Sequence, residues 1–356
     1  MAKIVGGFAS GHTPLMYYTK PEHWFAQGEG DKRNIELVRP SDGKRVTYDE
    51  LLASADPSIA RLINAEIFEE RIDNIHAGVE ELNKRFGQVN PDVVVMFGDD
   101  QGELFFDDNY PMISLYWGAG IRLLKRRTGP SETQQLMARH WSGLRGDEDE
   151  HDYPVDSGLG LHIIESLIDQ DFDIAHMRYQ RDTYGGSIGP ATWYLDMKRT
   201  TEPRPQGLSH AFAYPITNWF DGKTPAIVPI TINTCYPPNW ISPRRAYALG
   251  KAVRRAVQEW DSDKTVTFAA SGGLSHFVVD EEIDRLALKG MAEADDEILS
   301  TLPRIRLQSA TTEILNWVSV AGAMGDTKMD VICYEPGYRS PAGTGCGCGA
   351  GTWLDS

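Results

Sequence analysis

Residues 266–276 read Val-Thr-Phe-Ala-Ala-Ser-Gly-Gly-Leu-Ser-His, an apolar run that ends at a glycine pair and is followed by a histidine. A short apolar run bounded by glycines predicts a buried strand followed by a sharp turn. Ligands of open α/β sheets bind just outside the carboxyl ends of the strands, so His276 is expected beside such a site. A histidine there can act as a base, an acid or a metal ligand near neutral pH. Taken alone, His276 could equally be a turn residue that bonds only to backbone.

Strands and helices alternate along the chain on both sides of this stretch. Further strands are predicted at 3–9, 93–97, 173–176 and 227–232. Helices are predicted at 57–86, 160–169, 243–259 and 310–324, two of them with apolar residues at three- and four-residue spacing. This alternation predicts an α/β sandwich, with a central, mostly buried mixed sheet flanked by helices. We expect one large catalytic domain over residues 1–356, with a helical insertion around 47–88 and a charged surface excursion around 125–157.

The composition excludes several classes of protein. A net charge of −16 argues against a nucleic-acid or anionic-membrane partner, because both require basic patches for phosphate groups. No run approaches the roughly 18 apolar residues that indicate a membrane span. Four cysteines in 356 residues form no disulfide framework and favour a reducing compartment. A cytoplasmic protein is therefore expected.

Polar residues follow three of the predicted strands at their carboxyl ends. His12 follows the first strand, Asp99, Asp100 and Gln101 follow the strand at 93–97, and His276 follows the quoted strand. If these strands are neighbours, their ends converge on one site. A carboxylate from the acidic residues 280–282 would complete an open metal site with nitrogen and oxygen ligands. The chain contains no HExxH motif and no paired CxxC motif, so spacing alone does not identify a metal.

The same residues resemble the class III extradiol dioxygenases, the family of the protocatechuate 4,5-dioxygenase catalytic subunit. The resemblance spans nearly the whole chain and is most specific at Gly272–His276. Its blocks occur in the family's order: Gly11-His12-Thr13-Pro14, Gly98-Asp99-Asp100, Asn233-Thr234-Cys235-Tyr236-Pro237-Pro238, Tyr247-Ala248-Leu249-Gly250, Gly272-Gly273-Leu274-Ser275-His276 and Glu282-Ile283-Asp284. The resemblance implies an extradiol ring-opening dioxygenase that takes a catecholic or related hydroxylated aromatic acid and O2, uses non-haem Fe(II), and forms a homodimer or larger homo-oligomer.

The resemblance also implies roles for individual residues. In the family, two histidines and a glutamate hold ferrous iron, and the histidine of the Gly-Gly-x-Ser-His block is an acid/base. Carried over, His12 is the first ligand, Glu282 is the carboxylate ligand and His276 is the acid/base. Gln101 stands where the family has its second histidine ligand, and an amide oxygen is a harder, weaker ligand than imidazole. Asp100 is the adjacent candidate to complete the metal site.

Two further residues are candidates for the pocket. Tyr184 stands where some relatives carry a pocket histidine, so it could hydrogen-bond a substrate oxygen or pack in the core. His210 could bind substrate or replace the missing ligand, or simply face solvent. The glycine-rich tail at 343–351, with its Cys-x-Cys pair, is interpreted as close backbone packing rather than as a metal site.

Three functions fit these residues. The first is a dioxygenase with an altered metal site. The second is an iron-less or metal-altered relative that performs hydrolysis, decarboxylation or C–C cleavage on an aromatic-type substrate. The third is a binding protein for aromatic acids. Because binding alone requires none of His12, His276 and Glu282, their joint presence argues against the third function, and we favour the first.

Overall fold

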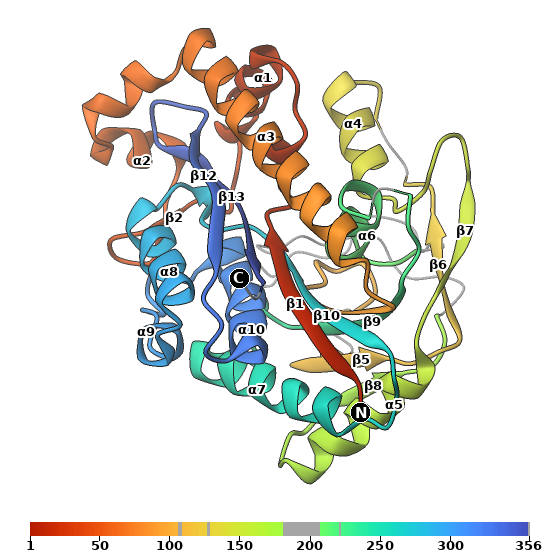
Figure 1. Cartoon of the computed structure of the whole chain (residues 1–356). Coiled ribbons are helices and arrows are strands. Elements are labelled where there is room, and N and C mark those ends of the chain that lie inside the picture. The colour runs from red at the N-terminus through yellow and green to blue at the C-terminus, as the bar shows by residue number, and fades with distance from the viewer. Residues whose placement is uncertain (106–108, 127–128, 181–206, 221, 355–356) are drawn as a thin grey trace.

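A nine-stranded mixed sheet runs through the middle of the protein (Figure 1). The computed structural model describes the chain except residues 106–108, 127–128, 181–206, 221 and 355–356. The strands lie in the order β11 (His276–Val278), β13 (Thr344–Trp353), β1 (Lys3–Ser10), β10 (Thr265–Ser271), β4 (Val93–Gly98), β9 (Ala226–Ile232), β5 (Ile113–Tyr116) and β8 (Ala175–Met177), with β12 (Asp330–Tyr338) paired to β13. The predicted single-domain α/β fold with a mixed sheet is confirmed.

The four central strands, β1, β10, β4 and β9, are parallel neighbours. Every residue of β4 is buried, as expected for a parallel strand covered on both faces. Its side chains alternate between two hydrophobic cores: Val93 and Val95 face one, while Val94 and Met96 face the other. The apolar run can therefore form a central strand, because helices and side chains cover both faces of the sheet.

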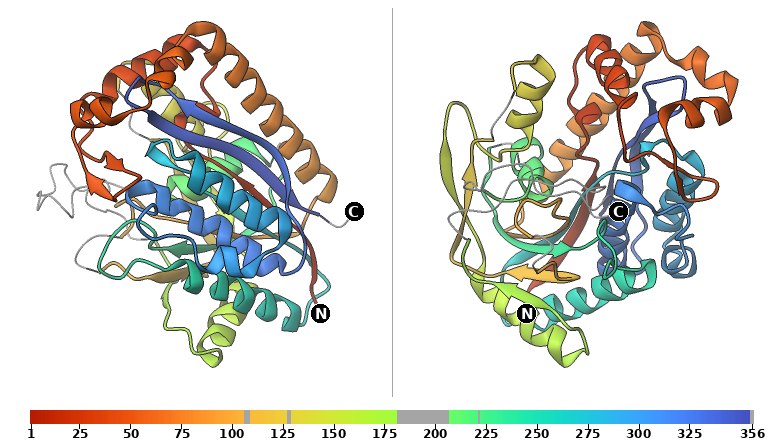
Figure 2. Two further views of the ribbon diagram at one scale, coloured as in Figure 1. Left: turned by 90° about the vertical axis from the view of Figure 1, so that its left-hand side faces the viewer. Right: turned by 180° about the vertical axis from the view of Figure 1, so that it is seen from behind.

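One core lies under α10 (Ile314–Met324), which packs on β1, β10 and β4 (Figure 2). Every residue of α10 is buried, because a second layer of helices covers it. A side chain on Gly250 would collide with the backbone of Ser319, so the glycine allows the helices to approach closely. The helices of this side are α5 (Ser157–Asp169), α7 (Pro243–Glu259), α8 (Glu281–Glu293) and α9 (Asp296–Ser300).

The other core lies beneath α3 (Ala65–Val89) and α6 (His210–Asn218), with α1 (Pro21–Asp31) packed on α3 and β13. The helix predicted at 57–86 is divided into a 3-10 helix, Pro57–Leu62, and α3. Asn64 separates them because its side chain accepts the N–H of Ile67, 3.0 Å away, and so caps α3. Before them lie β2 (Val38–Arg39), β3 (Lys44–Arg45) and α2 (Tyr48–Ser54).

Where the structure describes them, residues 125–157 hold more regular structure than a charged surface excursion. They contain α4 (Glu132–His140) and β7 (Glu150–Pro154), which pairs with β6 (Gly120–Leu124). The Nε1–H of Trp141 donates to the carbonyl oxygen of His12 at 2.9 Å, so this segment is attached to the predicted site. The acidic residues 147–150 are exposed, as expected.

The glycine-rich tail forms β13, a fully buried strand between β1 and β12. A side chain on Gly347 would collide with the carboxylate of Asp284, which agrees with the interpretation of close packing. All four cysteines are free thiols. Among the described residues, no helix combines the length and the apolar character that a membrane crossing requires.

Candidate active site

The carboxyl ends of β1, β10 and β4 bring buried polar side chains together. His12 follows β1, Asp99 follows β4, and Glu313 directly precedes α10. Ligand atoms of these three residues all lie within 4.8 Å of one another. His276, just beyond β10, joins the same cluster. The expectation that polar strand ends converge is therefore correct, because the three strands are adjacent in the sheet.

Glu313 lies between the two histidines of the cluster. One carboxylate oxygen, Oε1, is 3.1 Å from Nε2 of His276, and the other, Oε2, is 3.3 Å from Nε2 of His12. Gln101 donates its amide N–H to Oε1, and Gly273 donates its backbone N–H to Oε2, both at 2.7 Å. Burial by itself raises the pKa of Glu313, but the two histidines and these donors outweigh it and lower the pKa. Glu313 is therefore a buried carboxylate held in its charged form.

His12 is suited to bind a metal as a neutral imidazole. Burial lowers its pKa to about 3, although Glu313 opposes the change. Its Nδ1 is 3.0 Å from the hydroxyl of Ser271, which can accept the ring proton. The lone pair of Nε2 is then directed toward Glu313 and the middle of the cluster.

Asp99 contributes a second carboxylate that lacks a full set of partners. Its side chain is 1% exposed, Oδ1 accepts a bond from Asn316 at 3.3 Å, and the side chain of Gln101 makes a further hydrogen bond to the carboxylate. Oδ2 is buried without a hydrogen-bond partner in the part of the chain that the structure describes. Burial, together with repulsion from Glu313 and Glu103, raises the pKa of Asp99 well above its usual value. A buried carboxylate of this kind requires either a proton or a nearby cation. The imidazole of His12 and the carboxylates of Asp99 and Glu313 together form a donor set that suits a divalent cation.

His276 is held in an orientation that suits proton transfer. Its Nδ1 lies 2.8 Å from the carbonyl oxygen of Leu274, which can only accept, so Nδ1 carries a proton. Burial alone would lower the pKa of His276, but the carboxylate of Glu313 outweighs burial and raises it. Gain and loss of a proton are therefore confined to Nε2, the nitrogen that faces Glu313.

His210 is a third buried histidine beside the cluster. Its ring centroid lies 4.6 Å from that of His12 and 4.5 Å from that of Trp141. Glu103 lies 2.7 Å from Nδ1 of His210, and Arg126 pairs with the other oxygen of Glu103 at 2.6 Å. The Glu103 carboxylate contacts the ring of His210 at Nδ1, so Nε2 is the ring nitrogen that can bond to another group.

These side chains line a cavity of about 70 Å³. The cavity wall combines the polar cluster with aromatic and apolar groups, as is usual for a small-molecule site. Its lining comprises His12, Thr13, Pro14, Gln27, Gln101, Trp141, His210, His276, Phe277, Glu313, Arg339 and Cys346.

Comparison with known proteins identifies the family. A family model described as the catalytic LigB subunit of aromatic ring-opening dioxygenase matches residues 57–339. The chain belongs to this family. The protein is thus a dioxygenase-type oxidoreductase of the ring-opening kind, and the resemblance inferred from the sequence is confirmed.

A solved structure, that of the uncharacterized protein JW3007 from Escherichia coli K12, is similar over 77% of this chain and 91% of its own. The sequence identity is 11% and the TM-score is 0.40.

Two of the expected metal ligands of this LigB-family protein do not lie at the cluster. The side chain of Glu282 is 74% exposed at the start of α8, where it pairs with Arg306. Asp100 accepts the backbone N–H groups of residues 103–105 at 2.8–3.2 Å, so its carboxylate is turned into its own loop. These placements correct both expectations: the carboxylates beside His12 come from Glu313 and Asp99.

Four of the other expected site residues lie at the cavity. His12, His276, Gln101 and His210 all line the cavity. Gln101 contacts Glu313 through its amide nitrogen. Tyr184 lies outside the described residues.

Sequence reasoning missed Glu313, although a signal was present. Glu313 is the last charged residue before the apolar run of α10, and its side chain is fully buried. A lone acid at the start of a buried helix requires a partner or a function. The relation was hidden because Glu313 lies 37 positions after His276 in the sequence.

Proposed function

We propose that the protein is an extradiol-type dioxygenase, which opens the ring of a catechol-type aromatic acid beside its two hydroxyl groups. Both atoms of O2 enter the product, so the reaction requires no external reductant. One observation carries this proposal. Glu313 lies between His12 and His276, so a metal ligand set and an acid/base share one buried carboxylate.

The residues of the cluster fit a divalent metal ion, and we assign Fe(II) to it. His12, Asp99 and Glu313 would hold the ion, with one nitrogen and two carboxylate donors. The familiar facial triad has two histidines and one carboxylate, so this chain would use a harder set of donors. When bound, Fe(II) supplies the redox chemistry with O2 that amino-acid side chains lack.

His276 would move the proton of a substrate hydroxyl. The carbonyl of Leu274 keeps the proton on Nδ1, so Nε2 is the atom that accepts the phenolic proton and later returns it. Its fixed ring orientation lowers the entropic cost of reaching the reacting oxygen. The backbone around His276 is tied by two hydrogen bonds: the Gly273 N–H donates to Glu313, and the His276 N–H donates to the hydroxyl of Thr311.

The remaining cavity wall would position the aromatic ring. His210 is fixed by Glu103 and offers Nε2 as a hydrogen-bonding atom for a substrate oxygen. Trp141 and Phe277 supply flat apolar surface that suits a ring and excludes water. Family membership does not favour the non-oxidative alternative.

Oxygen uptake by reconstituted protein tests the proposal. The protein is purified without oxygen, loaded with Fe(II) and mixed with catechol or protocatechuate in an oxygen-electrode cell. We expect one O2 consumed for each ring opened, with both atoms of isotopically labelled O2 in the product. Iron-loaded protein that consumes no O2 with these or related dihydroxylated rings would contradict the proposal, as would ring opening without O2.

A further inference from the structure

A buried carboxyl group is bonded to the turn that carries His276. It belongs to Asp284 on α8, whose side chain is fully buried and has no part in the chemistry proposed so far. Asp284 accepts the backbone N–H of Ser275 on Oδ1 and the Ser275 hydroxyl on Oδ2, both at 2.7 Å. Ser275 immediately precedes His276 in the sequence, so α8 is joined to the proposed acid/base through a single peptide bond.

Every polar atom of Ser275 has a hydrogen-bond partner. Besides the bonds to Asp284, its hydroxyl oxygen accepts the N–H of Asp280, the residue before α8, at 2.9 Å. Its carbonyl oxygen accepts the N–H of Gly347 on β13 at 2.8 Å. The backbone of the turn is therefore fixed by α8 and by β13 together.

The glycine-rich strand β13 makes room for the carboxyl group. A side chain on Gly347 would collide with Oδ2 of Asp284, so glycine at this position lets the strand and the carboxyl group both contact Ser275. Oδ2 also accepts the hydroxyl of Tyr334 on β12 at 2.9 Å. The carboxyl group is thus enclosed by α8, the two strands and the turn.

Stability alone does not account for Asp284. Removing a carboxylate from water is unfavourable, and its three donors offset the penalty only in part, because burial still raises the pKa of Asp284 to about 7. An apolar side chain of similar size would fill the same space without this penalty. An apolar side chain could not, however, accept the N–H and the hydroxyl of Ser275.

We propose that Asp284 is a positioning residue for His276 and acts through Ser275. The turn that Asp284 holds places Nδ1 of His276 2.8 Å from the carbonyl oxygen of Leu274. It also places Nε2 3.1 Å from Glu313. The inference rests on the proposed function, in which Nε2 of His276 accepts and returns the substrate proton. A displacement of about 1 Å at such an atom can lower the rate about 100-fold.

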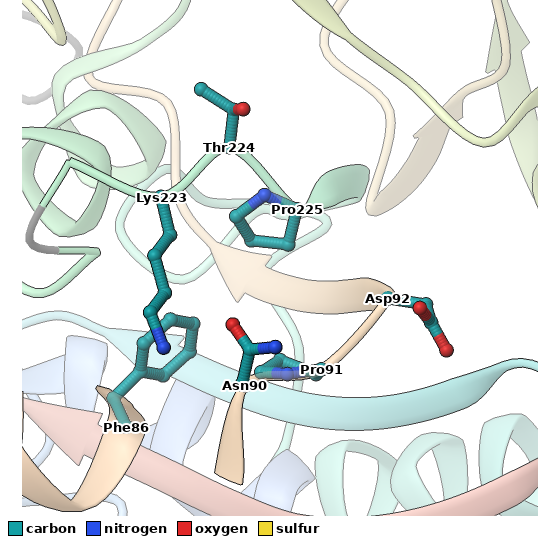
Figure 3. Close-up of a pocket in the computed structure, with 7 residues that line it drawn as sticks. All are labelled: Phe86, Asn90, Pro91, Asp92, Lys223, Thr224 and Pro225. Atoms are coloured by element: carbon teal, nitrogen blue, oxygen red, sulfur yellow. The ribbon is translucent and has the colours of Figure 1, made fainter. Parts of the chain in front are cut away.

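A matched control is available at the opposite end of β10. Asp92 accepts the backbone N–H and the hydroxyl of Thr265, both at 2.8 Å, just as Asp284 does with Ser275. Thr265 is the first residue of β10, and Asp92 lines a hollow of about 260 Å³ where β4 and β9 begin (Figure 3). The two carboxylates therefore make the same pair of bonds, but only those of Asp284 lie beside the site.

Steady-state kinetics of the Fe(II)-loaded protein test the proposal. Asp284→Leu removes both acceptors, so we expect kcat to fall about 10- to 100-fold with KM nearly unchanged, the pattern of an interaction needed in the transition state. Asp284→Asn keeps an acceptor for the Ser275 N–H and should recover most of the loss. Asp92→Leu and Tyr334→Phe remove bonds that do not reach Ser275, and both should keep the wild-type kcat.

The tautomer of His276 gives a readout that needs no turnover. NMR of the full-length protein with nitrogen-labelled histidine, at alkaline pH and before iron is added, distinguishes a protonated ring nitrogen from a bare one. His276→Gln identifies the signals. We expect the wild type to carry the proton on Nδ1 alone and Asp284→Leu to show both tautomers. Ser275→Ala removes only a hydroxyl, should show the same mixture with a lower kcat, and replaces Asp284→Leu if that variant does not fold.

Several results would overturn the inference. They are a wild-type kcat in Asp284→Leu or Ser275→Ala, a single Nδ1–H tautomer in both variants, or an equal loss of kcat in Asp92→Leu. Parallel losses of Fe(II) affinity, substrate affinity and kcat in Asp284→Leu would also overturn it, because they indicate a collapsed site rather than a displaced histidine. If the tautomers mix as expected but the wild type consumes no O2, only the proposed function fails.

Discussion

Oε1 of Glu313 lies 3.1 Å from Nε2 of His276, and the side chains are 0% and 6% exposed. The pair brings together two segments of the chain, the turn after β10 and the start of α10. A buried ion pair of this kind is stable only while both partners remain. Glu313 therefore couples the orientation of the proposed acid/base to the proposed metal site.

Glu313→Gln should weaken Fe(II) binding at least about tenfold, because even residues that only orient metal ligands contribute that much to affinity. The amide also removes the charge that raises the pKa of His276. Competition with a chromophoric chelator measures the affinity. Glu282→Gln is the matched control and should bind iron like the wild type, since Glu282 pairs with Arg306 at the surface. Iron loss in the control, with none in Glu313→Gln, would restore Glu282 as the ligand.

Asp99→Asn should affect the metal-free and iron-loaded proteins in opposite directions. Without metal, the change removes a buried carboxylate whose Oδ2 lacks a partner, so the melting temperature should rise by a few degrees, corresponding to about 1 kcal/mol. With Fe(II), the variant should gain less stability than the wild type because one ligand is lost. Differential scanning calorimetry with and without Fe(II) gives both values.

Asp100→Asn is the companion variant to Asp99→Asn. It should lower stability in both states, because the Asp100 carboxylate accepts three backbone N–H groups. An identical response of the two variants to Fe(II) would argue against Asp99 as a ligand.

Glu103→Gln should impair the substrate-binding role of His210. Glu103 accepts the Nδ1–H of His210 and forms an ion pair with Arg126. The uncharged amide of a glutamine at this position would remove that ion pair. We expect KM to rise about tenfold with a smaller change in kcat, since the loss concerns substrate positioning. Steady-state kinetics separate the two constants. A fall in kcat alone would exclude positioning as the role of Glu103.

Asp284 should make the protein less stable as the pH rises from about 4 to about 7. Burial raises the pKa of this carboxyl group to about 7, although Ser275 and Tyr334 donate hydrogen bonds to it. In the unfolded chain its pKa is near 4, so between these values the folded state binds more protons and stability falls with increasing pH. The loss should reach about 2–4 kcal/mol near neutral pH.

Urea unfolding of wild type and Asp284→Asn between pH 4 and 8 checks this expectation. The free energy of unfolding of the variant should fall much less over this pH range, because an amide does not titrate. Curves with the same slope in both proteins would show that Asp284 keeps an ordinary pKa.

Several features could be predicted from local sequence. The run at 93–97 had to be a covered strand, because no exposed strand can present apolar side chains on both faces. His12 and His276 could be assigned to the site because each comes within a few residues of the end of a strand, β1 or β10, and the ends of parallel strands share one edge of a sheet. The glycine-rich tail could be interpreted as close packing, since only glycine permits such contact.

Other features depended on the tertiary structure. Asp99 and Asp100 are adjacent, and only the path of the chain after β4 decides which carboxylate turns toward His12. Gln27 lines the cavity from α1, a helix that is absent from the elements predicted from the sequence, and α1 is held in place by the two bonds between Asp31 and Arg339 across the fold.

The sequence by itself thus determined the α/β class, the edge of the sheet that carries the site, and two of its histidines. These follow from periodicity and from the geometry of parallel strands, which are local properties. Only the tertiary structure selected Glu313 over Glu282. The Glu313 carboxylate lies 3.3 Å from His12 because of how α10 packs against the sheet, and nearness in sequence to His276 plays no part in this.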